Sequence, residues 1–346
     1  MKYGVIPSNM LERLALWMGK VPVPLLDSLF SIMKTRSIMA GVRLGIFEAL
    51  RDGPLAARDV AARCRLDPEC TELLLRLLVG VEYLELHGEQ FALNDLSQRT
   101  LIAGAEQELI GYVLWNYWQW EMVAGLDDLI RTGRGIDFHE TMTDPEAWAN
   151  YQRAMKEVAR FSAPLVADRV PVKGGARRLL DIAGSHGLFG AAICRKHPPM
   201  KSTVLDLPAA IEHARELARA EKIDDVVEHR AGDLLADDYG KDNDVVLLSN
   251  ILHHFNEATN IAILRRAFDS LTAAGTVAIW EIEAPEKDAS PTSGDGAALF
   301  FRLTSNARCY HGSEYERWLQ QVGFKEVRTS RPALSPGSVL VTGRRP

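Results

Sequence analysis

From about residue 176 onward, the chain alternates short apolar runs with segments whose apolar residues recur at helical intervals. The runs predict buried strands, and the segments between them predict helices. We expect strands at 178–183, 202–207, 226–230, 244–249 and 276–283, and helices at 187–196, 208–221 and 258–273. A helix at 313–322 and short strands at 325–330 and 338–343 complete the pattern. This alternation predicts an α/β domain built on a doubly wound sheet.

The first hundred residues have helical periodicity instead. Between residues 10 and 50 the apolar positions predict amphipathic helices, with a large apolar surface. A short helix after Pro54, a second helix that begins at Asp67-Pro68 and a hairpin around Gly88 follow. Helix, helix and hairpin in this order predict a winged-helix unit. Because so small a unit cannot cover this apolar surface by itself, we expect a homodimer through it.

Many winged-helix units bind DNA, but the charges of this one argue against such a partner. The candidate recognition helix, 69–80, has Arg76 as its only cation, beside Glu69 and Glu72. Phosphate contacts require several Lys or Arg side chains on one face. The whole chain has a net charge of -6, which does not favour nucleic acid or an anionic membrane. We expect no nucleic-acid partner and no membrane partner.

The segment 106–170 predicts helices that are rich in large aromatic side chains. Trp115, Trp118 and Met122 fall on one helical stripe, and Tyr151 and Met155 fall on another. Most aromatic residues at this spacing pack in a core, yet a pocket for a flat apolar molecule needs such walls. A length of 346 residues suits two or three units, which we place at 1–105, 106–170 and 171–346.

The cysteines and the apolar runs indicate the compartment. Cys64, Cys70, Cys194 and Cys309 lack the paired spacing of a metal site, which is the pattern of reduced thiols. No apolar run reaches membrane length, and no cleavage site follows an apolar core. We therefore expect a cytoplasmic protein without a metal site.

The segment 178–190, RLLDIAGSHGLFG, carries the clearest chemical signal. It predicts a strand, a tight turn of small residues and a helix, with Asp181 near the end of the strand. A dinucleotide-binding turn has the spacing Gly-x-Gly-x-x-Gly, whereas these glycines stand at 184, 187 and 190. A carboxylate here would repel a pyrophosphate, but it would attract the ammonium group of S-adenosylmethionine. A nicotinamide dehydrogenase is the weaker alternative.

A second carboxylate ends the next predicted strand. Asp206 is placed where it can accept hydrogen bonds from both hydroxyls of a ribose. Doubly wound sheets bind ligands at the carboxyl ends of their strands, and Asp233, His253 and Glu281 also fall there. The plain alternative is an ordinary strand, turn and helix with capping acids.

With these motifs the chain resembles class I S-adenosylmethionine-dependent O-methyltransferases of the small-molecule type, such as caffeate- and hydroxyindole-methylating enzymes. The resemblance runs nearly end to end. It implies a Rossmann-like catalytic domain after a winged-helix dimerisation domain, with S-adenosyl-L-methionine as cofactor and S-adenosyl-L-homocysteine as product. The residues that we assign to the cofactor are Asp181, Gly184, Gly187, Asp206, Leu207, Asp233, Leu234 and Ser249.

The resemblance also implies a catalytic pair. In the segment LSNILHHF, His253 matches the general base of the family, and Glu281, in EIEAP, matches a glutamate that orients it. Ser249 stands where many plant members have a lysine, and Cys309 stands where they have a second orienting glutamate. Tyr310 and His311 are the candidates to assist the remaining carboxylate.

The chemistry of the reaction supports this pair. A phenol of pKa ~10 facing an imidazole of pKa ~6.5 makes complete prior proton transfer uphill by about 5 kcal/mol. The proton should therefore leave as the methyl group arrives, and the enzyme needs alignment and a base but no metal.

The aromatic stripes predict a small aromatic acceptor. The residues that we assign to its pocket are Trp115, Trp118, Met122, Tyr151, Met155, His254 and Phe300. Two other functions stay open: a protein of the same fold with hydroxylase or decarboxylase chemistry, and a cofactor-binding dimer without turnover. His253 and Glu281 argue against the second, because neither is needed for binding alone.

Overall fold

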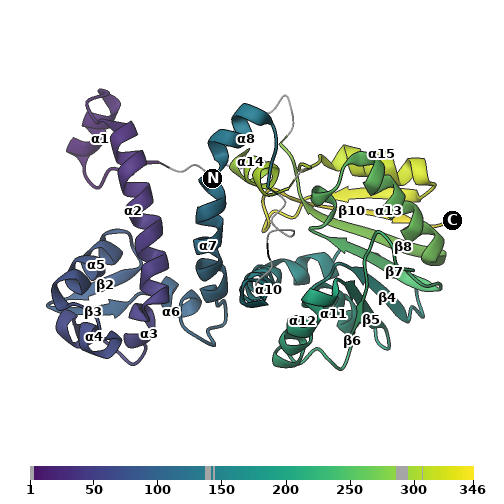
Figure 1. Ribbon diagram of the computed structural model, residues 1–346, viewed down its shortest axis with the longest axis horizontal. Helices are drawn as coiled ribbons and strands as arrows, with labels where there is room; N and C mark the ends of the chain where they lie inside the picture. The colour runs from purple at the N-terminus through teal and green to yellow at the C-terminus, as the bar shows by residue number, and fades with distance from the viewer. Residues whose placement is uncertain (1–3, 137–141, 143–144, 286–294, 306) are drawn as a thin grey trace. The chain divides into compact units, whose positions relative to one another are not determined.

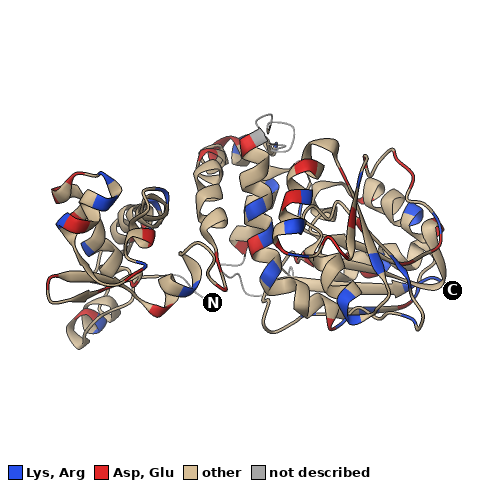
Figure 2. Ribbon diagram, turned by 90° about the horizontal axis from the view of Figure 1, so that it is seen from below, with Lys and Arg blue, Asp and Glu red and all other residues tan. Residues whose placement is uncertain are grey.

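The computed structural model describes residues 4–136, 142, 145–285, 295–305 and 307–346 (Figure 1). Its internal contacts divide the chain into two units, Met1–Trp118 and Gln119–Pro346. The boundary falls inside helix α7 (Ile110–Val123). Basic and acidic residues are interspersed in both units (Figure 2).

The first unit combines helices with a small antiparallel sheet. Its helices are α1 (Met10–Trp17), α2 (Val23–Arg43), α3 (Ile46–Ala49), α4 (Ala57–Cys64), α5 (Pro68–Gly80) and α6 (Asp95–Thr100). Its strands are β1 (Leu55–Ala56), β2 (Leu84–His87) and β3 (Gln90–Leu93), in the order β1-β3-β2. The expected helix start is confirmed, because the side chain of Asp67 caps α5 by accepting from the Cys70 amide. The hairpin turns at Gly88, whose φ of 63° favours glycine.

The core of this unit leaves one long helix largely uncovered. Ile46, Phe47, Leu75 and Phe91 are among its buried residues. Of the 21 residues of α2, only Ser37, Met39 and Gly41 are buried. Large apolar side chains of α1 and α2 are exposed instead, namely Met10, Leu11, Leu14, Trp17, Leu25, Leu29, Phe30, Ile32 and Met33. Apolar surface of this extent predicts a protein partner.

The second unit is a seven-stranded sheet of order β6-β5-β4-β7-β8-β10-β9. Its strands are β4 (Arg178–Ile182), β5 (Lys201–Asp206), β6 (Val227–Ala231), β7 (Asn243–Ser249), β8 (Leu271–Ile282), β9 (Lys325–Ser330) and β10 (Ser338–Arg344). Strands β4 to β8 run parallel, and β10 pairs antiparallel with β8 and β9. The predicted α/β class and doubly wound sheet are confirmed. The strand order changes direction at this point: β5 and β6 lie on one side of β4, and β7 and β8 lie on the other. Doubly wound sheets form a ligand crevice between the two strands where this happens, here β4 and β7.

Helices cover both faces of this sheet (Figure 1). The second unit contains α8 (Leu126–Thr132), α10 (Pro145–Ala167), α11 (Leu188–Lys196), α12 (Pro208–Ala220), α13 (Glu257–Ser270), α14 (Asp295–Thr304) and α15 (Gly312–Val322). Of these helices, α10, α11, α12, α13 and α15 pack over the sheet. Leu180 and Val246 face the cluster that contains α13 and α15, whereas Leu179 faces the one that contains α10 and α11. Successive residues of a strand point to opposite faces of the sheet. Since helices cover both faces, all residues of β7 are buried and its apolar side chains pack on both sides.

One predicted boundary is wrong. The helix expected at 258–273 ends at Ser270, and β8 begins at Leu271 rather than at 276. Leu271 pairs with Asn243 of β7, so strand pairing overrides the helical pattern of the sequence there. Among the helices in the described ranges, none is both long and apolar enough to cross a bilayer.

We predict that the exposed face of α1 and α2 is the dimer interface. Substituting Leu29→Lys together with Phe30→Glu should shift the protein from dimer toward monomer, because buried charges at an apolar interface are costly. Sedimentation velocity over a concentration series measures the shift. Leu334→Lys, at an 84% exposed position of the second unit, is the matched control. A parent protein that is monomeric at every concentration would contradict the prediction.

Candidate active site

A cavity of about 350 Å³ opens at the carboxyl ends of the parallel strands. Its walls come from the segments after β4, β5, β6 and β7 and from α10. The lining residues are Trp148, Tyr151, Gln152, Ala183, Ser185, Leu205, Asp206, Leu207, Ala210, Gly232, Asp233, Leu234, Leu235, Asn250, Ile251, His254 and Phe255. The sheet therefore gathers polar groups at the edge where the sequence placed them.

The turn between β4 and α11 has an unusual backbone. Ala183 and Ser185 have φ values of 53° and 47°, which side-chain-bearing residues rarely adopt. Gly184 is required by the protein itself, because a Cβ there would lie 2.3 Å from Cγ of Asp181. At Gly187, which has a φ of 77°, a Cβ would lie 2.7 Å from a methyl group of Val227. Ala183 and Ser185 line the cavity, whereas the two glycines do not belong to its lining.

Ser185 is held by hydrogen bonds from two neighbouring strands. Its amide donates to Oδ2 of Asp206 over 2.9 Å, and its carbonyl lies 3.0 Å from Nε2 of His229. Burial lowers the pKa of His229, which favours the neutral ring with its proton on Nε2. These contacts hold the strained turn in place. His229 carries no signal in the sequence, because it lies inside β6.

The two acids that the sequence assigned to the cofactor differ in place and in partners: Asp206 lines the cavity, whereas Asp181 lies outside its lining. Asp206 accepts from the amides of Ser185 and Leu207, while burial raises its pKa to about 6. Asp181 is fully buried, and neither of its oxygens has a well-formed hydrogen bond from the described residues. Burial raises the pKa of Asp181 to about 7; the Gly190 amide opposes this rise, and the nearby charge of Asp206 adds to it. A buried carboxyl group without a well-formed hydrogen bond is suited to a cationic ligand.

The segment after β6 forms another rigid wall. The carboxylate of Asp233 accepts from the amide of Leu235 over 2.8 Å. The carbonyl of Leu234 accepts from the Tyr239 hydroxyl and from the Arg266 guanidinium. Leucine side chains and an acid at its edge fit an adenine ring with its attached ribose.

His253 and Glu281 come together in the interior. His253 belongs to a single 3-10 turn, η1 (Leu252–His254), directly after β7, and Glu281 lies near the end of β8. Nδ1 of His253 lies 2.7 Å from Oε2 of Glu281, and the two side chains are 2% and 0% exposed. Oε1 of Glu281 accepts from the amides of Ile251 and Leu252, at 2.8 and 2.6 Å. A carboxylate that accepts at both oxygens places the proton on Nδ1, so Nε2 keeps the lone pair of a base.

The turn that carries His253 lines the cavity through the neighbours of His253 rather than through His253 itself. Asn250, Ile251, His254 and Phe255 line the cavity, and His253 itself is not part of the lining. The ring of His253 lies 4.4 Å from that of Phe301 and 4.2 Å from that of His254. Phe301 has no signal in the sequence beyond its aromatic character. Ser249 is buried at the end of β7, outside the lining.

Of the residues predicted for the acceptor pocket, Tyr151 and His254 line the cavity. Met122, Met155 and Phe300 lie in the second unit, outside its lining. Trp115 and Trp118 belong to the first unit, where their rings stack at 5.4 Å, and their place in a pocket stays a prediction. Trp148 and Gln152 were missed, although they lie three residues before and one residue after Tyr151 on α10. In the described part of the chain, no cluster of three His, Cys, Asp or Glu residues could hold a metal ion.

This chain is similar to curated proteins in sequence and to solved structures in fold. The 3-hydroxy-5-methyl-1-naphthoate 3-O-methyltransferase of Streptomyces sahachiroi is 28% identical over 333 residues, 92% of this chain and 93% of that protein. The structure of the mitomycin 7-O-methyltransferase MmcR is 25% identical, with a TM-score of 0.81 over 98% of this chain and 100% of that one. Human N-acetylserotonin methyltransferase, in complex with S-adenosylmethionine, has a TM-score of 0.83 at 19% identity, over 98% of this chain and 99% of that one.

Two family models cover most of the sequence. The O-methyltransferase dimerisation domain matches residues 26–102, which supports the homodimer. The O-methyltransferase domain matches residues 116–325, more than half of the chain. The chain therefore belongs to the O-methyltransferase family, and it is an S-adenosylmethionine-dependent O-methyltransferase.

Proposed function

We propose that the protein methylates a hydroxyl group of a small aromatic molecule, with His253 as the general base. The observation that carries this proposal is the fully buried contact of 2.7 Å between Nδ1 of His253 and Glu281. It leaves Nε2 free of its own proton and fixes the plane of the ring. Mere binding of a cofactor would require neither feature.

We assign the cofactor to the cavity at the strand ends. Asp206 would bind the ribose hydroxyls, because its two amide donors fix the carboxylate and leave a second lone pair on each oxygen. Asp181 would balance the methionine ammonium from beneath the turn at Gly184 and Gly187. Leu207, Asp233 and Leu234 would flank the adenosine, and Ser249 would support this wall from the end of β7.

The bound cofactor supplies an electrophilic methyl group. The protein has to align the acceptor oxygen with it and to remove the proton of that oxygen as the new bond forms. We propose that Nε2 of His253 takes this proton, and that the charge of Glu281 stabilises the resulting imidazolium. The low exposure of both side chains strengthens this attraction, because little water screens it.

Aromatic side chains near the base support an aromatic acceptor. Phe255, two residues after His253, lines the cavity, and Phe301 packs against the ring of His253. The Streptomyces relative is named for a hydroxynaphthoate acceptor, which has the flat shape that such walls suit. A mass-spectrometric screen of phenols, hydroxyquinones and hydroxynaphthoates for a gain of one methyl group would identify the acceptor.

We predict that His253→Gln lowers the methylation rate by about 10² to 10⁴ and leaves cofactor affinity nearly unchanged. Part of the rate should return with acceptors that are already ionised at the assay pH, because their proton no longer has to be removed. Glu281→Gln should give a smaller loss of the same kind. Steady-state rates across a series of acceptor pKa values measure both effects.

The matched control for this series is His87→Gln, which breaks an exposed contact of 3.0 Å between a histidine and Glu85. It should leave the rate unchanged. If His253→Gln were as fast as the parent on a phenol of ordinary pKa, the general-base role would be wrong, and alignment alone would account for catalysis.

We predict that Asp206→Ala weakens S-adenosylmethionine binding about tenfold to a hundredfold, since a charge-assisted contact contributes roughly 1.5–3 kcal/mol. Isothermal titration calorimetry gives the dissociation constant. Asp224→Ala, which removes an exposed acid outside the cavity lining, should bind like the parent. An unchanged constant in a folded Asp206→Ala protein would remove Asp206 from the site.

Cofactor affinity should rise with pH over the range in which the buried acids ionise. Asp181 and Asp206 have pKa values raised by burial to about 7 and about 6, so both carry less charge below these values. We expect the affinity to increase at least severalfold from about pH 5.5 to about pH 8. The same ionisation destabilises the cofactor-free fold as the pH rises, so the cofactor-induced increase in Tm should grow. A pH-independent dissociation constant would contradict this prediction.

A further inference from the structure

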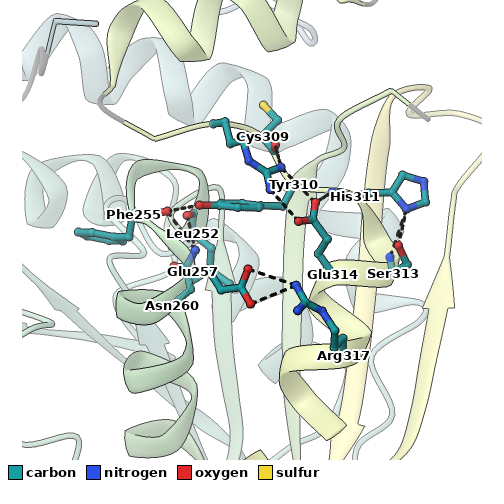
Figure 3. Close-up of polar contacts among 11 residues, drawn as sticks. Leu252, Phe255, Glu257, Asn260, Cys309, Tyr310, His311, Ser313, Glu314 and Arg317 are labelled. Carbon is teal, nitrogen blue, oxygen red and sulfur yellow. Dashed lines mark hydrogen bonds and ion pairs between the residues drawn. The ribbon is translucent and has the colours of Figure 1, made fainter. Parts of the chain in front are cut away.

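The turn that carries His253 is anchored on both sides by other parts of the fold. On its N-terminal side, Glu281 accepts from the amides of Ile251 and Leu252, as described above. On its C-terminal side, the carbonyls of Leu252 and Phe255 both accept from Nδ2 of Asn260, at 3.0 and 3.2 Å. The Phe255 carbonyl has a second donor, the hydroxyl of Tyr310, at 2.7 Å (Figure 3).

Tyr310 is well suited to hold this carbonyl in one place. It is 3% exposed, and its ring packs edge-on against Trp318 at 4.8 Å. The guanidinium of Arg308 also lies 4.3 Å from the centroid of the Tyr310 ring. Arg308 is itself fixed by an ion pair of 2.7 Å with Glu314. A side chain confined in this way directs its hydroxyl without further loss of rotamer freedom.

The neighbours of Tyr310 do not provide a second carboxylate for the base. Cys309 is buried, which raises its pKa to about 12, so it remains a neutral thiol. His311 caps the N-terminus of α15 through Ser313 and Glu314. Of the three residues that the sequence placed at this position, Tyr310 contacts the turn that bears the base, through its hydroxyl.

We propose that Tyr310 is a positioning residue for His253, which acts through the backbone of the turn rather than by touching the base. Its hydroxyl holds the Phe255 carbonyl, two residues after His253, while Glu281 holds the turn from the other side. With both ends fixed, the imidazole keeps its distance to Glu281 and its direction toward the acceptor. This proposal rests on the proposed role of His253 as the base.

The chain offers a closely matched pair of variants for a test. Tyr310→Phe removes the hydroxyl that binds the Phe255 carbonyl and keeps the ring. Tyr315→Phe removes a hydroxyl from a neighbouring ring that packs 5.3 Å from the same Trp318. The Tyr315 hydroxyl is buried and has no hydrogen-bond partner in the described part of the chain. Loss of aromatic packing or of a buried hydroxyl as such would therefore affect both variants.

The kinetic readout compares two acceptors at saturating cofactor. The best acceptor of the methyl-transfer screen is assayed beside its nitro-substituted analogue, at a pH where only the analogue is ionised. Tyr310→Phe should slow the first acceptor about threefold to tenfold and the second hardly at all. Tyr315→Phe should behave like the parent with both. An equal loss with both acceptors, or no loss with either, would overturn the proposal.

A spectroscopic readout needs no acceptor. The proton between Nδ1 of His253 and Glu281 should give a downfield NMR resonance, which His253→Gln assigns by removing it. Tyr310→Phe should shift or broaden this resonance, and Tyr315→Phe should not. If Tyr310→Phe does not fold, Asn260→Leu, which removes the other donor to the same carbonyl, should give the same change. An unaltered resonance in the folded variant would contradict the proposal.

The two proposals fail in different ways. If His253→Gln keeps the parental rate on an un-ionised phenol, the general-base role is wrong, whatever Tyr310→Phe does. If His253→Gln is slow while Tyr310→Phe matches the parent in rate and resonance, the positioning role alone is wrong. In the His253→Gln background, adding Tyr310→Phe should cause no further selective loss with the un-ionised acceptor.

Discussion

The buried carboxylate of Glu281 is the group on which the rest of the site depends. A carboxylate at 0% exposure is costly unless its oxygens are satisfied, and here one imidazole and two backbone amides satisfy them. The same three contacts fix the ring of His253 and the backbone that carries it. The pairing of β7 with β8 makes this possible, because Ser249 lies opposite Trp280, the residue before Glu281. The register of two parallel strands thus sets the geometry of the proposed base.

The two acids that we assign to the cofactor differ from Glu281, because burial raises the pKa of both. Asp181 is buried without a well-formed hydrogen bond from the described residues, and its pKa is raised. Such a group lowers the stability of the empty protein but increases its attraction for a cation. Asp206 is intermediate, because two amides orient it while burial still raises its pKa. In this view the proposed cofactor site exchanges some folding stability for binding, whereas the His253 and Glu281 pair is already satisfied without a ligand.

The apolar core on one face of the sheet is linked to the edge of the cavity. Tyr310, Tyr315 and Trp318 belong to the apolar cluster that contains α13 and α15. The hydroxyl of Tyr310 extends from this cluster to the Phe255 carbonyl, and Phe255 also lines the cavity. Packing on one face of the sheet is therefore connected to the cavity edge through a single turn.

The sequence by itself determined the elements whose signals are local. β7 contains the apolar run 245–248 because both of its faces are buried, and α5 begins where Asp67 can cap it. Asp206 and Glu281 could be placed near the cavity edge and the base because strand ends meet at one side of a doubly wound sheet. Tertiary structure decided the rest. Trp148 and His229 reach the site from a helix and a strand interior that carry no local motif, and α13 ends at Ser270 because Leu271 pairs with β7. The sequence named Tyr310 as a candidate, but only the structure shows that its hydroxyl binds the Phe255 carbonyl. These contacts join residues far apart in the chain, so only the packing of complete elements brings them together.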